Sequence, residues 1–141
     1  MVEFEVTHID QDKYPTIDLM KMLHDEMIRR MKESRVDETS LYVCYGAALN
    51  PEEIDMRTVV GKINGLPFKN ADGKWVAAVT MCDSLAGRAM KDAMKSLLAA
   101  GVPMKIYVAS VTDSHKITGP WHMWFAPHRR YVVEAMAAKS I

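Results

Sequence analysis

The stretch that decides the fold reads WVAAVTMCDSLAGRAM over residues 75–90. Its first seven residues are apolar apart from one threonine and do not alternate cleanly, which is typical of a strand buried on both faces. A helix is predicted from Ser84 to Ala100, with Gly101 as its terminator. A second, mostly apolar strand follows over residues 102–110. Strand, helix and strand in this order predict a right-handed parallel crossover.

The segment before this unit predicts two strands and a helix. Residues 2–7 alternate apolar and polar side chains, as a half-buried strand does. Pro15, Thr16 and Asp18 open a helix, and Thr16 is its expected cap. Residues 41–45 form the next expected strand. The helix carries an apolar stripe that is expected to lie in the core, made of Met20, Leu23, Met27 and Met31.

The remaining segments complete the expected order. Residues 50–53 (Asn-Pro-Glu-Glu) are a strong helix start, and that helix is expected to end near Gly61 or Gly65. Residues 70–73, which end in Asp-Gly, predict a hairpin turn. A last strand is expected over residues 121–125 and a last helix over residues 127–139. The fold class predicted is α+β: a mixed, largely central sheet flanked by helices, in the order β-α-β-α-β-β-α-β-β-α.

Length and composition bound the class of protein. The chain has 141 residues, 49% of them hydrophobic, and its 18 basic side chains balance 18 acidic ones. We therefore expect one domain over residues 1–141, without general nucleic-acid binding. There are two cysteines, no leader pattern among the first ten residues, and no apolar run approaching the ~18 residues of a membrane span. These features predict a reduced, cytoplasmic protein that does not cross a membrane.

The loop between strand 75–81 and the following helix is the first candidate site. In open α/β sheets, ligands gather beyond the carboxyl ends of strands, and free N–H groups at a helix start bind anions. Gly87 would let a ligand approach the backbone closely. Asp83 and Ser84 are also good caps, so a capped helix start with an incidental glycine explains the same residues without a ligand.

The run from Ser84 to Ala89 resembles the cofactor loop of the GNAT-like N-acyltransferase superfamily, Arg/Gln-x-x-Gly-x-Gly/Ala between a strand and a helix. The resemblance covers about residues 62–110. It implies an acyl-CoA cofactor contacted at Gly87 and Ala89, and the candidate cofactor-binding residues of this loop are Ser84, Gly87, Arg88 and Ala89. Ser84 stands where that family has a long polar residue, and the family's tyrosine acid has no clear counterpart after Ser110. The resemblance therefore implies no catalytic residue.

The same loop places Cys82 and Arg88 at the Cys-x5-Arg spacing of cysteine phosphatases, in which a thiolate attacks phosphorus. The similarity is one of spacing, since Ala89 stands where a hydroxyl residue usually supports the thiolate. We expect Cys82 to be a small buried side chain at a strand end rather than a nucleophile.

The second candidate site is the basic cluster of His128, Arg129 and Arg130, in the first turn of the expected last helix. Positive charge there opposes the helix dipole by ~0.3–1 kcal/mol per charge. An anion bound at the free N–H groups would offset this cost. Ion pairs with nearby acids, or simple solvent exposure, are the alternatives.

Two further hypotheses concern the imidazoles and indoles of the last third of the chain. His115, His122 and His128 lack the spacing of a compact zinc motif, so no metal site is predicted. Trp121 and Trp124 could stack a planar ring. Residues three apart on a strand point to opposite faces, so one of the two indoles is expected in the core.

The sequence thus predicts a domain that binds a small phosphorylated or otherwise anionic molecule, with GNAT-like acyl transfer from acyl-CoA as its enzyme form. The rival hypothesis is a non-catalytic protein that sequesters a small molecule or inhibits a partner protein. A protein partner or a homo-oligomer is compatible with either. The residues do not decide between an enzyme and a binding protein.

Overall fold

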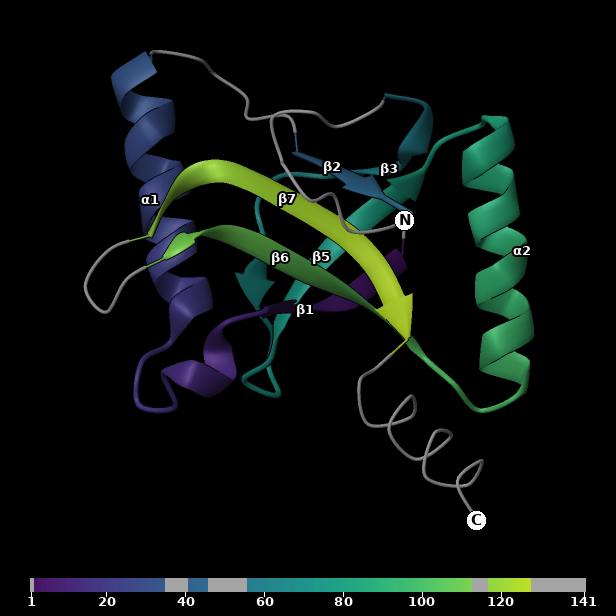
Figure 1. Cartoon of the computed structure of the whole chain (residues 1–141), viewed down its shortest axis with the longest axis horizontal. Coiled ribbons are helices and arrows are strands. Elements are labelled where there is room, and N and C mark those ends of the chain that lie inside the picture. Colours follow the sequence, from purple (N-terminus) through teal and green to yellow (C-terminus); the bar gives the residue numbers. More distant parts are fainter. Residues whose placement is uncertain (1, 35–40, 46–55, 113–116, 128–141) are drawn as a thin grey trace.

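The computed structural model of the chain describes residues 2–34, 41–45, 56–112 and 117–127 (Figure 1). Two short 3₁₀ turns, η1 (Gln11–Lys13) and η3 (Met56–Thr58), precede α1 and β3. The helices and strands of these ranges are, in chain order, β1 (Val2–His8), α1 (Leu19–Ser34), β2 (Leu41–Cys44), β3 (Val59–Ile63), β4 (Phe68–Lys69), β5 (Trp75–Met81), α2 (Leu85–Ala99), β6 (Met104–Thr112) and β7 (Ile117–Pro127).

The described strands form one mixed sheet that closes on itself. Its order is β1-β6-β7-β2-β3-β5, and the pairing of β5 with β1 joins the two ends into a six-stranded barrel. β1 runs parallel to β6 and β2 runs parallel to β7, whereas the other neighbours are antiparallel. The short β4 pairs with the first residues of β5, on the edge where β3 pairs with the last ones. Closure satisfies backbone groups that an open sheet would leave unpaired at its edges.

The closed sheet corrects the predicted architecture. The combination of helices with a mixed sheet is confirmed, but the central sheet flanked by helices is wrong. The parallel crossover through α2 is wrong as well, because β1 lies between β5 and β6. Phe4 of β1 pairs with Ala77 in antiparallel register and Val6 pairs with Ile106 in parallel register, so β5 and β6 run in opposite directions. The handedness rule holds only for strands that are parallel in one sheet.

Residues predicted at the end of one helix and at the start of another belong to strands. Residues 59–63, where the helix from Asn50 was expected to end, form β3 instead, and Leu41 faces Ile63 across the ladder. The β-branched residues of this segment favour a strand. Pro127, the expected start of the last helix, is the last residue of β7 and faces Met104. Residues 50–53 and 128–139 lie outside the described ranges.

Helix α1 packs as its sequence pattern predicts. Its stripe recurs at helical spacing, and three members are almost fully buried in the same cluster as the inward side chains of the barrel, namely Met20, Leu23 and Met27. Burying a side chain of this size stabilises the fold by roughly 1.5–3 kcal/mol. Three of the four residues of this stripe therefore belong to the core, and Met31 is half-buried.

Asp18, rather than the expected Thr16, caps α1. Its Oδ1 accepts the backbone N–H of Lys21 at 3.2 Å, and both carboxylate oxygens accept the indole N–H of Trp75 at 3.1 Å. The ammonium of Lys69 lies 3.4 Å from Oδ2. Burial of the carboxyl opposes its ionisation, but the hydrogen bonds from Trp75, Lys21 and Lys69 outweigh it and lower the pKa of Asp18. The start of α1 is thereby fixed to β4 and β5.

Helix α2 ends as predicted, at a glycine. Gly101 has a φ of +81°, which only glycine adopts without strain. Its N–H donates to the carbonyl of Leu98 at 2.9 Å, and the N–H of Val102 donates to the carbonyl of Leu97 at 2.8 Å. These two bonds define a Schellman motif. The chain then turns directly into β6.

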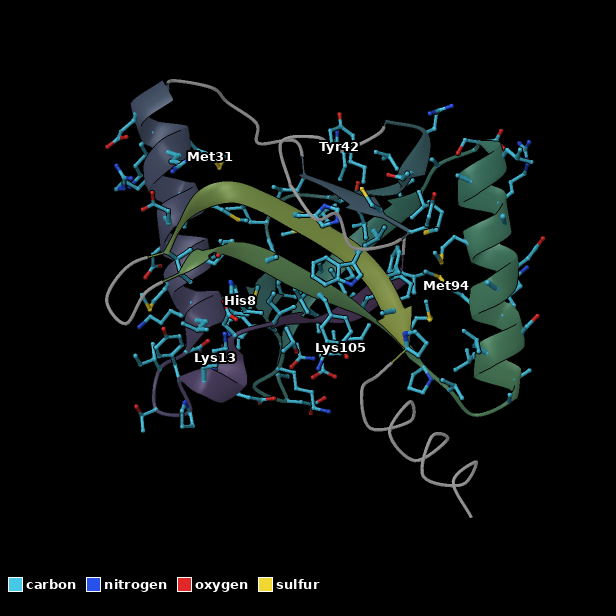
Figure 2. The ribbon with its side chains drawn as sticks, viewed as in Figure 1. His8, Lys13, Met31, Tyr42, Met94 and Lys105 are labelled. Atoms are coloured by element: carbon cyan, nitrogen blue, oxygen red, sulfur yellow. The ribbon has the colours of Figure 1, made fainter. Side chains whose placement is uncertain are left out.

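The two helices lie on opposite sides of the strands (Figure 1). α1 supplies fully buried side chains to the core, whereas α2 contributes the half-buried Ala86, Met90 and Met94, the last of which points toward the strands (Figure 2). α2 is therefore held by a narrower contact than α1. No helix in the described ranges is both long enough and apolar enough to cross a membrane.

Candidate functional site

The predicted site at the start of α2 is a closely packed helix cap. The Oγ of Ser84 accepts the N–H of Gly87 at 3.1 Å, and the N–H of Arg88 donates to the carbonyl of Ser84 at 2.9 Å. Gly87 is buried, and a Cβ added to it would lie 2.0 Å from the carbonyl oxygen of Cys82. The space beside Gly87 that a ligand would enter is therefore filled by the chain's own backbone.

The other two predicted residues of this turn are exposed. The guanidinium of Arg88 donates to Oδ1 of Asp83 at 2.8 Å, and Ala89 faces solvent. A carboxylate at the helix start competes with any external anion for both the arginine and the helix dipole. Anion binding at this turn stays a prediction, and helix capping accounts for each residue placed there. The same ion pair engages the arginine that a Cys82-centred phosphatase site would need.

The second predicted site, His128, Arg129 and Arg130, lies outside the described ranges, and so does His115 of the zinc hypothesis. His122 is described and lies in β7. Within the described residues, no three His, Cys, Asp or Glu side chains gather closely enough to hold a metal ion.

An imidazole–hydroxyl pair that the sequence did not suggest joins β1 to β6. The Nε2 of His8 lies 2.7 Å from the Oγ of Ser110, and Nδ1 of His8 accepts the backbone N–H of Asp10 at 3.1 Å. Because Nδ1 is an acceptor, the neutral imidazole carries its proton on Nε2 and donates it to the hydroxyl. Burial lowers the pKa of His8, although the charge of Asp10 opposes this, so the neutral form is favoured. In this tautomer His8 cannot take a proton from Ser110, and the pair is structural rather than nucleophilic.

A different set of side chains gathers on the face of β1, β6 and β7 that is turned away from the core. Ile106, Met123 and Phe125 point into the core, so the residues that alternate with them point outward. The registers align Thr7 with Tyr107 and Tyr107 with Trp124. We call this face the aromatic platform; its members are Glu5, Thr7, Lys105, Tyr107, His122 and Trp124.

The rings of the aromatic platform are nearly parallel. The centroids of Tyr107 and Trp124 are 6.2 Å apart with 26° between the ring planes. The centroids of His122 and Trp124 are 5.2 Å apart with an angle of 20°. The rings of Tyr107 and His122 therefore stack against the ring of Trp124, and of the three only Trp124 is partly exposed.

The platform is enclosed although it lies outside the core. Tyr107 is 8% exposed and His122 is 2% exposed, whereas Trp124 and Glu5 remain partly accessible. An enclosed surface strengthens electrostatic contacts, because less water screens them. Access to the platform therefore runs along Glu5 and Trp124.

One cation lies at the border of the platform. Lys105 is 8% exposed, its Nζ lies 3.3 Å from Oε1 of Glu5, and the same Nζ lies 5.8 Å from the ring centroid of Tyr107. Lys105 appears on the face of β6 beside β1 in Figure 2. A lysine this well buried is uncommon unless it is paired. The platform thus combines planar rings with an ammonium group.

Two members of the platform figure in hypotheses from the sequence: Trp124, together with Trp121, as a ring that could stack a planar ligand, and His122 in the zinc hypothesis. The sequence analysis missed Lys105, Tyr107 and Glu5. Alternation over residues 104–108, where Lys105 and Tyr107 flank Ile106, was the available signal for an outward face. The strand is mostly apolar, so this alternation does not stand out in the sequence.

Comparisons with protein-family models, with curated proteins and with solved structures found no match to this chain. The residues of the chain itself therefore have to support any functional proposal.

Proposed function

We propose that this protein binds a small molecule that combines a planar ring with an anionic group, and that the aromatic platform is its site. The observation that carries the proposal is the near-parallel set of Tyr107, Trp124 and His122 with the ammonium of Lys105 at its border. Trp124, the partly exposed ring of this set, supplies stacking and the ammonium supplies charge, which are the two interactions that such a ligand needs.

Binding is better supported than catalysis. The imidazole–hydroxyl pair of His8 and Ser110 has its proton on the wrong nitrogen for general-base activation of the serine. At the start of α2, Arg88 is paired with Asp83. The groups of the described ranges that resemble catalytic ones are thus accounted for by structural hydrogen bonds.

The acyl-CoA proposal belongs to the same chemical class, because coenzyme A carries a planar base and phosphates. It differs in location, since it assigns the cofactor to Ser84, Gly87, Arg88 and Ala89. If it holds, Arg88→Gln should weaken coenzyme A binding whereas Trp124→Leu should not. Lys91→Gln, an exposed residue of the same helix, is the matched control for Arg88→Gln.

The test is calorimetric titration of the purified chain with adenosine 5′-monophosphate, coenzyme A and inorganic phosphate, preceded by native mass spectrometry to detect a retained ligand. We expect ring-bearing probes to bind and phosphate alone to bind more weakly. Trp124→Leu should weaken binding roughly fivefold to hundredfold, the equivalent of one lost stacking partner. Tyr42→Leu, an exposed aromatic of β2, is the control. Equal affinities of wild type and Trp124→Leu would refute the proposal.

A second candidate function is binding of a protein partner through α2. Leu85 is 81% exposed and Leu98 is 67% exposed, so two large apolar side chains of this helix face water. Light scattering of the wild type and of Leu98→Gln tests the homo-oligomeric form. A wild type that is monomeric at high concentration counts against it.

A further inference from the structure

The ion pair at the border of the platform has an unequal solvent environment. The side chain of Lys105 is 10% exposed and that of Glu5 is 38% exposed. The carboxylate of Glu5 can therefore be hydrated outside the pair, while the ammonium stays beside the ring of Tyr107. Breaking the pair alone would leave a largely buried ammonium unpaired, so another anion has to take the place of Glu5.

The pairing of β6 with β7 places Lys105 and Trp124 close to each other on the sheet. Trp124 faces Tyr107 directly across the ladder, and Lys105 lies two residues along β6 from Tyr107. Lys105 and Trp124 are thus diagonal neighbours, roughly 7–8 Å apart at the backbone. A base and a phosphate joined by one sugar carry a ring and an anion that can occupy two such neighbouring positions together.

We propose that the platform is specific for nucleoside monophosphates, with Lys105 as the phosphate-binding residue and Glu5 as the residue that limits affinity. This inference rests on the proposed function. The base stacks at Trp124, and the phosphate displaces the Glu5 carboxylate from Lys105. One anion replaces another at the same ammonium, so the bound state leaves no cation unpaired. Glu5 then acts as an internal competitor, and its charge repels the incoming phosphate.

The experiment compares adenosine with adenosine 5′-monophosphate, two probes that share a ring and differ in the phosphate. Calorimetry of the wild type should give tighter binding of the monophosphate. Lys105→Met keeps the packing of the long side chain and should abolish that preference, lowering monophosphate affinity tenfold to hundredfold, the range of a charged hydrogen bond. Thermal melts establish that the variant is folded.

Glu5→Gln gives the sharper result, because it should tighten binding. Removing the competing charge should raise monophosphate affinity about threefold to tenfold and leave adenosine unchanged. Glu3→Gln is the matched control, since Glu3 lies two residues earlier on the same face of β1 and its neighbour on β5 is Ala78. It should change neither affinity.

The outcomes separate this inference from the proposed function. Adenosine and its monophosphate binding equally, with both affinities dependent on Trp124, would overturn the inference and leave the proposed function standing. Neither probe binding to the folded wild type would overturn both. Weaker monophosphate binding in Glu5→Gln would overturn the competitor role of Glu5.

Discussion

Replacing Gly87 by alanine should destabilise the protein strongly, contrary to the usual effect of this change in a helix. Alanine normally stabilises a helix by roughly 0.5–1 kcal/mol relative to glycine. At position 87 the new Cβ would lie 2.0 Å from the carbonyl oxygen of Cys82 and 3.1 Å from the Oγ of Ser84. Heavy atoms in contact normally keep ~3.5–4.0 Å. The first of these neighbours is backbone and cannot rotate away.

The magnitude follows from what must move. Overpacking costs typically 1–3 kcal/mol, and a shift of the helix start would also break the bond from Gly87 to Ser84, a cap worth ~1 kcal/mol. After subtraction of the propensity gain, the free energy of unfolding should fall by roughly 1–3 kcal/mol. For a chain of this size that corresponds to a drop in Tm of about 3–12 °C.

Urea denaturation and thermal melts measure this loss directly. Ser96→Ala, at an exposed position of the same helix, is the control and should change stability by a few tenths of a kcal/mol. A Gly87→Ala variant as stable as the wild type would refute the close packing at this turn. The space beside Gly87 would then be open to a ligand, as the sequence first suggested.

Three other predictions follow from the described contacts. Asp18→Ala should lower the free energy of unfolding by ~0.5–2 kcal/mol, because it removes a helix cap. Since the folded state lowers the pKa of Asp18, this contribution should be present above the usual value near 3.8 and be lost as pH falls through the folded pKa. Denaturation of the wild type and the variant at pH 7 and pH 3 measures the difference. The folded pKa of His8 lies below 6.5, so the unfolded chain binds this proton more tightly and the free energy of unfolding should fall as pH drops below that value. His8→Gln should flatten this part of the stability–pH curve. An unchanged slope in the variant would contradict the prediction. Burial raises the pKa of the Cys44 thiol, whereas Cys82 is only half-buried. A thiol reagent should therefore label Cys82 before Cys44, which peptide mass spectrometry measures. The reverse order would argue against the packing of β2.

Local patterns predicted several of the elements but not their arrangement. The strand over residues 75–81, the helix after Ser84, its end at Gly101 and the Asp72-Gly73 turn of the β4–β5 hairpin are confirmed, because each depends on neighbours in sequence. The closed sheet depends on β1 pairing with both β5 and β6. Those partners lie about seventy and one hundred residues away in the chain, and no periodicity within a strand encodes which strand will lie beside it.

The two candidate sites differ in how far apart their residues lie in the sequence. The sequence predicts a site at the start of α2 because Ser84, Gly87 and Arg88 are close together in sequence, and a motif consists of such neighbours. Those residues bond mainly to one another, so their pattern is the signature of a stable turn. The aromatic platform draws Thr7, Tyr107 and Trp124 from three strands, and only the ladder aligns them. Tyr107 and His122 are almost fully buried, so they also help to pack this face, and the partly exposed Trp124 is the member on which the binding proposal depends.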